Sequence, residues 1–342
     1  MAYTTIDKPT DYFNTVLYTG NGSTQSITGV GFQPDWIWIK GRSVVAGNNL
    51  HDVVRGVNKQ LYTNTADAEE TLTTLVTSFD SDGFSLGSNG NANSNTNTFV
   101  AWNWLASNTT ASNTDGSITT TVSVNQTAGF SIMKYAGNST NSTIGHGLGA
   151  SPEFIIFKEI DGAESWRVHS IYTPNNSTNT LALNLNSAAF SQTNWISAIS
   201  SSTISIGTDS SFNTSGNNYI AYAFAPKKGY SKFGSYTGNG STNGTFVHTG
   251  FRPAFLLIKR TDTTGGWYII DNKRNTYNPL NLYVQPDSAN GDSTFTFFDF
   301  YANGFKNRST GADANASGAN VIYMAFAENP FVSSGGIPCT AR

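Results

Sequence analysis

The chain has 342 residues, only 12% of them charged and 13% aromatic, and its formal net charge is −3. This length allows two or three domains, and no basic stripe can neutralise phosphates, so we expect no nucleic-acid binding. No apolar stretch approaches the roughly 20 residues that a membrane-spanning helix needs, and residues 1–9 lack the pattern of an export signal. We therefore expect a soluble chain without membrane insertion.

In chain order, a polar arm at 1–11 precedes a predicted strand at 12–19 and a tight Thr-Gly-Asn-Gly turn at 19–22. An apolar strand at 36–40 follows, and its aromatic and β-branched residues are typical of a strand buried on both faces. A strand at 99–104 then closes this part of the chain. Stretches 53–61 and 66–76 are compatible with a helical turn or two, but the overall pattern is β.

The same succession of elements occurs three times. The openings lie at 12–23, 129–138 and 230–241, the strands that end in lysine at 31–40, 151–158 and 250–259, and the closing strands at 99–104, 219–224 and 321–326. A repeat of this length indicates one structural unit per copy. The predicted fold is all-β, with three tandem β-sandwich units of the jelly-roll or lectin-like kind joined by short linkers.

The repeats set the predicted boundaries. They are an N-terminal arm (1–11), repeat 1 (12–106), a linker (107–121), repeat 2 (122–226), repeat 3 (227–328) and a C-terminal arm (329–342). Cys339 in the last arm is the single cysteine, so it cannot form an intrachain disulfide. Arms this polar are expected to become ordered only against a neighbour.

Two Asp–Arg pairs are the most informative polar recurrence. Asp52 and Arg55 follow the first lysine strand, and Asp271 and Arg274 follow the third, whereas the second copy has His169-Ser-Ile-Tyr there. The favoured interpretation is an ion pair that fixes a loop, worth roughly 0–1 kcal/mol if it is exposed. The alternative is a ligand-binding use.

Tryptophans are the second group of candidates, because aromatic faces stack on sugar rings and amides bond hydroxyls. Trp102 and Trp104 are expected to lie on different faces of the closing strand, one in the core and the other exposed or at an interface. Trp166 and Trp267 precede equivalent strands and are expected in the repeat core, and Trp195 is also available.

Other polar residues do not form a consistent site between copies. The four histidines, His51, His146, His169 and His248, are expected on surfaces or in turns. Lys40, Lys158 and Lys259 recur without a matching acid, which indicates a solvent-facing strand end. Asp80 and Asp82 resemble the start of a calcium loop, but no acidic ligand follows, so an Asp-Gly turn is favoured. No cofactor or metal is expected.

Several longer segments are distinctive. They are Met-Ala-Tyr-Thr-Thr-Ile-Asp-Lys-Pro-Thr-Asp-Tyr-Phe at 1–13, Leu-Tyr-Thr-Gly-Asn-Gly-Ser-Thr at 17–24, Gly-Phe-Gln-Pro-Asp-Trp-Ile-Trp-Ile-Lys-Gly-Arg at 31–42, Asp-Ser-Asp-Gly-Phe at 80–84 and Asn-Pro-Phe-Val-Ser-Ser-Gly-Gly-Ile-Pro-Cys-Thr-Ala-Arg at 329–342. Across essentially the whole chain, the sequence resembles virion structural proteins of marine tailed bacteriophages such as cyanophages. The resemblance carries no defined functional residue.

The resemblance implies a structural protein on the surface of a virion, assembled in the host cytoplasm. The leading hypothesis is a tail-fibre or receptor-binding element that binds host-surface glycans without catalysis and contacts other virion proteins through its terminal arms. The rival is an architectural capsid decoration, head-fibre or tail adaptor protein held by those arms. An enzyme such as a glycan depolymerase, which needs paired carboxylates, is the least favoured class. The expected assembly is either a homotrimer or a monomer whose three copies mimic a trimer.

Overall fold

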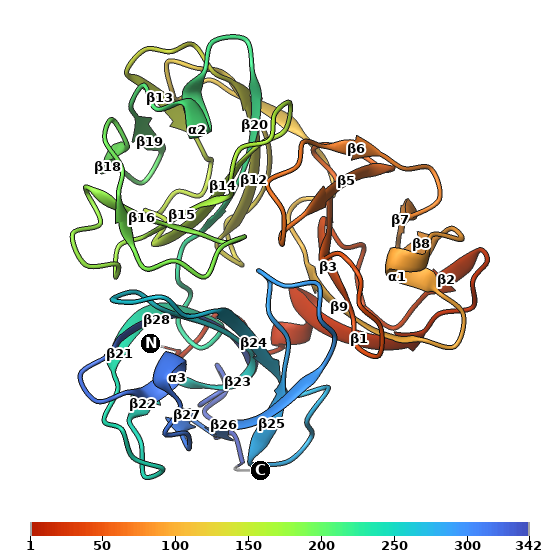
Figure 1. Ribbon diagram of the computed structural model, residues 1–342, viewed down its shortest axis with the longest axis vertical. Helices are drawn as coiled ribbons and strands as arrows, with labels where there is room; N and C mark the ends of the chain where they lie inside the picture. The colour runs from red at the N-terminus through yellow and green to blue at the C-terminus, as the bar shows by residue number, and fades with distance from the viewer. Residues whose placement is uncertain (1, 341–342) are drawn as a thin grey trace.

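Three antiparallel β-sandwich units follow one another along the chain in the computed structural model, which describes residues 2–340 (Figure 1). The predicted all-β fold is therefore confirmed. Each unit pairs an inner sheet, which faces the centre of the molecule, with an outer sheet that faces away from it. No helix within residues 2–340 is long and apolar enough to cross a membrane.

Unit 1 comprises residues 12–106, preceded by the 3-10 helix η1 (Pro9–Asp11). Its elements are β1 (Phe13–Thr19), β2 (Gln25–Ile27), β3 (Trp36–Gly41), β4 (Asn49–Asp52), β5 (Lys59–Tyr62), β6 (Glu70–Thr71), β7 (Val76–Asp80), β8 (Gly83–Leu86), α1 (Gly90–Asn93) and β9 (Thr98–Trp104). The inner sheet has the order β1-β9-β3-β4-β5-β6 and the outer sheet β2-β8-β7. The stretches 53–61 and 66–76 contain turns and strands instead of the expected helical turns.

Unit 2 comprises residues 107–226. Its elements are β10 (Ala111–Asn113), β11 (Thr120–Asn125), β12 (Phe130–Ala136), β13 (Ser142–Gly145), β14 (Phe154–Glu159), β15 (Arg167–Ser170), β16 (Asn179–Ala182), β17 (Phe190–Ser191), β18 (Ile196–Ile199), β19 (Thr203–Ile206), α2 (Ser210–Asn213) and β20 (Asn218–Phe224). The inner sheet is β10-β11-β12-β20-β14-β15-β16-β17 and the outer sheet β13-β19-β18. The segment expected as a linker, 107–121, thus contains β10 and the start of β11.

Unit 3 comprises residues 227–330. Its elements are β21 (Ser231–Thr237), β22 (Phe246–His248), β23 (Phe251–Arg260), β24 (Trp267–Asp271), β25 (Leu280–Tyr283), β26 (Ser293–Tyr301), β27 (Gly304–Asn307), α3 (Ala312–Asn315) and β28 (Asn320–Pro330). The inner sheet is β21-β28-β23-β24 and the outer sheet β22-β27-β26-β25. In every unit the strand that ends in lysine therefore lies beside the closing strand.

Strand β3 shows why the inner sheets are apolar on both faces. Successive residues of a strand point to opposite faces. Ile37 and Ile39 pack between the two sheets of unit 1, whereas Trp36 and Trp38 point toward the centre of the molecule. The predicted burial on both faces is confirmed, and the second face belongs to a core that all three units share.

Aromatic rings from all three closing strands fill this central core. Trp104 of unit 1 and Phe224 of unit 2 both lie against Phe326 of unit 3, with ring centroids 5.6 and 5.9 Å apart. Trp36 also stacks on Tyr222 of unit 2 at 4.9 Å. Each unit has a further apolar core between its own sheets. Because separate units would expose the central surface, we expect the three units to be stable together.

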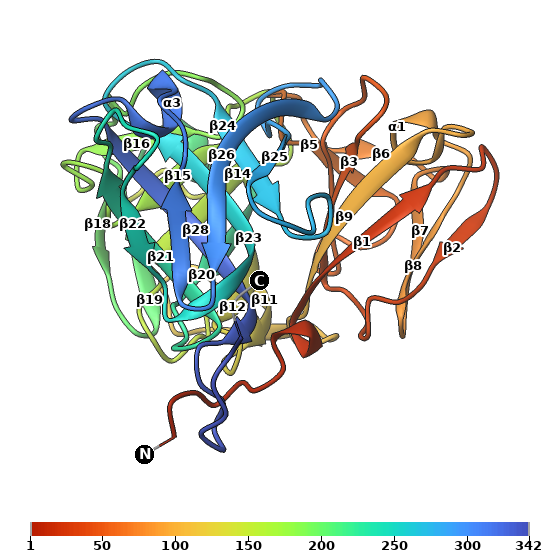
Figure 2. The same cartoon turned by 90° about the horizontal axis from the view of Figure 1, so that it is seen from below.

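The terminal segments leave the three units at the same end of the molecule (Figure 2). Thr4 and Ile6 are buried, and the Thr4 hydroxyl donates a hydrogen bond to the carbonyl of Lys228 at 2.8 Å. The backbone N–H and the hydroxyl of Ser334 both donate to the carboxylate of Asp7. The two arms are therefore ordered against each other and against the body of the same chain.

Candidate functional site

The two Asp–Arg pairs are buried between units. Arg55 Nε donates to Asp52 Oδ2 at 2.5 Å, and Arg274 Nε donates to Asp271 Oδ2 at 2.6 Å, with all four side chains 0% exposed. Asp52 Oδ1 also accepts the backbone N–H groups of Val54 and Arg55, so the pair does fix a loop. A neighbouring unit covers each pair, so the small contribution of an exposed ion pair does not apply to them.

Each aspartate accepts a further hydrogen bond from that neighbouring unit. The Tyr222 hydroxyl of unit 2 donates to Asp52 Oδ2 at 2.7 Å, and Trp102 Nε1 of unit 1 donates to Asp271 Oδ2 at 3.2 Å. Trp102 and Tyr222 occupy equivalent positions on the closing strands β9 and β20. These candidate residues therefore form interfaces inside the chain, where no solvent-borne ligand reaches them.

A second acid completes each network. Arg55 Nη1 contacts Glu69 at 3.3 Å, and Arg274 Nη1 contacts Asp292 at 3.0 Å. Burial opposes the guanidinium charge, but the adjacent carboxylates raise the pKa of both arginines above the ordinary value. We call each set of Asp, Arg and second acid a charged clasp. One joins units 1 and 2, and the other joins units 3 and 1.

The boundary between units 2 and 3 has no charged clasp among the described residues. Ser170 stands where the other units have aspartate, Thr173 stands where they have arginine, and Ala189 replaces the second acid. The donor from the closing strand is also replaced, by Met324. The backbone bond at the position of the second acid is kept, from the N–H of Ala189 to the carbonyl of Thr261 at 2.9 Å.

The tryptophans belong to these interfaces. Trp102 and Trp104 both face the central core at 0% and 1% exposure, so the expectation of opposite faces is wrong. Residues two apart in a strand share a face. Trp166 and Trp267 are in the core as expected, and the indole N–H of each donates to a backbone carbonyl of the preceding unit, at 2.9 and 2.8 Å.

The three repeated lysines are buried, so the expectation of solvent-facing strand ends is wrong. Each is at most 1% exposed. Lys40 Nζ donates to the carbonyl of Ser288 in unit 3 at 2.8 Å, and Lys259 Nζ donates to the carbonyl of Asn186 in unit 2 at 3.2 Å. Burial lowers the pKa of Lys40 to about 7 and the pKa of Lys158 and of Lys259 to about 8. A loop of the neighbouring unit covers Lys40 and Lys259.

Three of the four histidines are also buried. His51, His146 and His169 are at most 4% exposed, contrary to expectation, and only His248 is on the surface. Burial lowers the pKa of His51 to about 3 and that of His169 to about 4, which keeps both rings neutral at pH 7.

Asp80 and Asp82 bond to protein groups. Asp82 accepts the backbone N–H groups of the loop at 29–31, at 3.1 and 2.6 Å, and these bonds lower its pKa. Asp80 accepts the hydroxyls of Ser78 and Ser85, both at 2.7 Å. Within residues 2–340, no three His, Cys, Asp or Glu side chains are grouped so that they could hold a metal ion.

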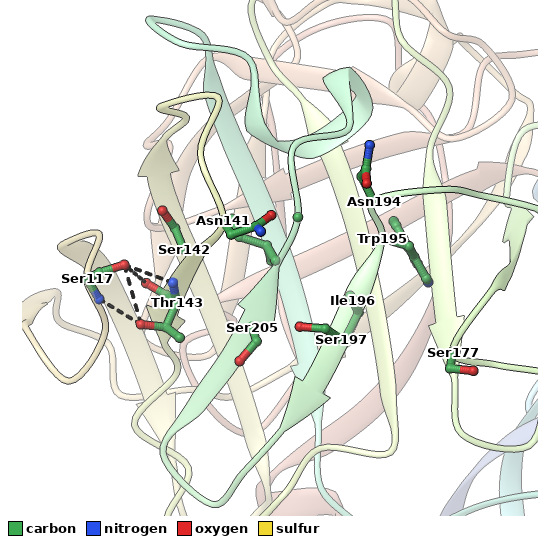
Figure 3. Close-up of a pocket in the computed structure, with 12 residues that line it drawn as sticks. Ser117, Asn141, Ser142, Thr143, Ser177, Asn194, Trp195, Ile196, Ser197 and Ser205 are labelled. Carbon is green, nitrogen blue, oxygen red and sulfur yellow. Dashed lines mark hydrogen bonds between the residues drawn. The ribbon is translucent and has the colours of Figure 1, made fainter.

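An open groove of about 680 Å³, lined by many polar side chains, lies on the outer sheet of unit 2, and we call it the polar groove (Figure 3). It is lined by Ser117, Asn141, Ser142, Thr143, Ser177, Asn194, Trp195, Ile196, Ser197, Ser205, Ile206 and Gly207. Ser117 and Thr143 bond to each other across one side, at 2.8 and 2.9 Å. Asn141, Asn194 and Ser197 are exposed, and their side chains make no hydrogen bond within the described part of the chain.

Trp195 forms part of the floor of the polar groove. It is 3% exposed and packs against Phe212 and Phe157, with ring centroids 4.9 and 5.9 Å apart. Its ring therefore cannot act as the stacking platform that the tryptophan content suggested. The groove offers hydroxyl and amide groups, which donate and accept hydrogen bonds without charge.

One buried asparagine that recurs in all three units was not identified from the sequence. Asn93, Asn213 and Asn315 end the three short helices, each five residues before the closing strand, and all are buried. The side-chain oxygen of each accepts the backbone N–H of the asparagine in the opening turn, at 2.9, 2.9 and 3.0 Å. Aligning the three copies on their closing strands would have identified these asparagines.

The chain belongs to the family described as a domain of unknown function (DUF7483), which matches residues 8–330. One match covers all three units, so the family is defined by the whole three-unit body. No curated protein and no solved structure matches the chain.

Proposed function

We propose that this chain is a non-catalytic protein of the surface of a virus particle, and that it binds host-surface glycans through the polar groove, as a tail-fibre or receptor-binding element does. The observation that carries the proposal is the set of unpaired hydroxyl and amide groups on the outer sheet of unit 2. Such groups match the alternating donors and acceptors of sugar hydroxyls.

The scaffold supports this proposal. Part of the groove lies on the paired strands β13, β19 and β18, whose other face is buried in the core of unit 2, so these side chains are held before a ligand arrives, and Asn141 and Asn194 lie in the short segments that lead into β13 and β18. A rigid site loses less conformational freedom on binding than a flexible loop does. The resemblance to virion structural proteins of marine tailed bacteriophages supports the location on a particle.

Matched alanine variants test the groove. Asn194→Ala removes a free amide from the groove, and Thr74→Ala changes the equivalent position of unit 1. The two positions are equivalent because the residue after each accepts the same backbone bond: the N–H of Gly207 donates to the carbonyl of Trp195, and the N–H of Gly87 donates to the carbonyl of Leu75. On an array of host-surface polysaccharides we expect binding by the wild-type chain, a loss of about fivefold in Asn194→Ala, and no change in Thr74→Ala. Absence of binding, or equal losses in both variants, would contradict the proposal.

A second candidate is an architectural role, in which the arms hold the chain in the particle. The observation that favours it is the contact between Asp7 and Ser334 at the end where both arms meet. Deleting residues 1–11 should then abolish incorporation into particles, whereas Asn194→Ala should not. Normal incorporation of the truncated chain would rule the role out.

A further inference from the structure

A second groove, of about 520 Å³, lies where the sandwich of unit 3 is open at its side. Strand β21 is the edge of the inner sheet there, and β22 is the edge of the outer sheet. The groove is lined by residues 232–237 and 245–248, together with Tyr172 of unit 2 and Tyr323. We call it the edge groove.

The backbone of β21 has bonding groups that point into the edge groove. The N–H of Gly238 donates to the carbonyl of Ala319, and the carbonyl of Tyr230 accepts the N–H of Ala327. The backbone N–H and C=O groups of the even-numbered residues of β21 therefore point toward β28. In an antiparallel ladder the alternate residues turn their N–H and C=O groups the other way. Phe233 and Ser235 therefore present backbone groups that bond to nothing within residues 2–340.

Unit 2 shows what closes the equivalent opening. There β11 adds to β12 as an antiparallel strand, with Thr121 opposite Lys134, and Ile118 bridges to Ile144 on the edge of the outer sheet. Lys134 corresponds to Ser235, since each precedes the tyrosine of the opening motif. Residues 117–125 thus fill in unit 2 the space that is empty in unit 3.

Unit 1 blocks part of its edge with side chains, on either side of Leu17. The Asn14 side chain accepts the outward N–H of Thr15 at 2.9 Å, and the Gln25 side chain donates to the outward carbonyl of Thr19 at 3.1 Å. In unit 3 the two ends of the edge are occupied, since Ser231 bonds to the backbone of Lys227 and the carbonyl of Thr237 accepts the Thr245 hydroxyl, and the outward backbone groups of Phe233 and Ser235 between them have no partner within residues 2–340. Folded proteins normally cover or block such edges.

We infer that the edge groove of unit 3 is a strand-acceptor site. An extended segment of another protein, rich in Ser, Thr and Val like residues 117–125, would add antiparallel to β21 through backbone hydrogen bonds. The arms of this chain are held elsewhere, by Thr4 on Lys228 and by Ser334 on Asp7. A second copy would have its own 117–125 segment in use, so the occupant is a different protein. This inference does not depend on glycan binding.

The test uses the full chain and a fluorescent peptide with the sequence of residues 116–126. We expect saturable binding with a Kd below about 1 mM, together with slower hydrogen exchange at Phe233 and Ser235. Ser235→Pro removes the outward N–H without removing a bond to β28, and it should weaken binding at least about tenfold. Leu17→Pro, at the equivalent position of β1, is the matched control and should leave binding unchanged. The melting temperature shows whether each variant folds.

Three results would overturn the inference. They are no binding of the peptide by the wild-type chain, equal binding by Ser235→Pro, and equal binding of a peptide with the same residues in scrambled order. Self-association of the wild-type chain that Ser235→Pro abolishes would also overturn it, because the occupant would then be a second copy.

Discussion

The boundary between units 1 and 2 and the boundary between units 2 and 3 are built on the same geometry but use different chemistry. The first contains Asp52, Arg55 and the Tyr222 hydroxyl, all buried, whereas the second has Ser170 and Met324 at two of the matching positions. Every member of the network is replaced at the second boundary, and no single charge is left behind. This is expected of buried charges, since an unpaired ion in the core destabilises far more than a neutral replacement does.

Backbone contacts are common to all three boundaries. The N–H of Glu69, Ala189 or Asp292 donates to a carbonyl of the neighbouring unit at 2.9, 2.9 and 2.7 Å, respectively. A side-chain N–H also crosses each boundary, from Asn48, Trp166 or Trp267. All three boundaries therefore share neutral backbone and side-chain donors, and the charged clasp is an addition that can be complete or absent.

The largest expected effect comes from breaking a charged clasp at one residue. Asp52→Ala leaves the Arg55 guanidinium buried without its closest carboxylate, at 2.5 Å in the wild-type chain. We expect the free energy of unfolding to fall by about 3–5 kcal/mol in urea denaturation. Ser170→Ala at the neutral boundary is the control and should change it by less than about 1 kcal/mol. Similar losses in both variants would show that the two boundaries do not differ.

Removing only the donor from the neighbouring unit should have a smaller effect. Tyr222→Phe deletes the hydroxyl that donates to Asp52 at 2.7 Å and keeps the ring that stacks on Trp36. A hydrogen bond to a charged group contributes about 1.5–3 kcal/mol, so we expect a loss in that range by thermal unfolding. Combined with Asp52→Ala, Tyr222→Phe should cost almost nothing more. Full additivity of the two losses would contradict the coupling.

The buried lysines predict that the stability of the folded chain depends on pH. Lys40 has its pKa lowered from 10.5 to about 7 by burial. Between those values the folded chain releases a proton that the unfolded chain keeps, so the stability of the folded state rises with pH. Relative to Lys40→Met, the wild-type free energy of unfolding should increase by up to about 1.4 kcal/mol per pH unit between pH 7 and 9. Parallel stability curves for the two chains would show that Lys40 is not desolvated.

Strands and repeats were predictable from the sequence because they depend on local patterns. The apolar run at β3 and its three copies identified the fold without any long-range information. The buried state of Lys40 was not predictable, since its bond partner Ser288 lies 248 residues away. The error at Trp102 and Trp104 had a different cause: residues two apart share a face, and no pattern in one copy shows that a second unit covers it.

The polar groove was also beyond sequence reasoning. It combines Ser117, Asn141 and Asn194 from separate segments, and serine and asparagine are common throughout this chain. The charged clasps were closer to prediction, because the Asp–Arg spacing recurs. Their burial and their second acids, Glu69 and Asp292, depend on the packing of units against one another.

The smallest expected effect is also the most informative about the two kinds of boundary. Replacing Asp52, Arg55, Glu69 and Tyr222 together by Ser, Thr, Ala and Met copies the neutral boundary into the charged one. Because all buried charges leave at once, we expect the free energy of unfolding to stay within about 1 kcal/mol of wild type, although Asp52→Ala alone costs several times more. If the free energy of unfolding fell by as much as the sum of the single variants, the charged clasp itself would hold units 1 and 2 together. The neutral boundary would then depend on packing that unit 1 lacks.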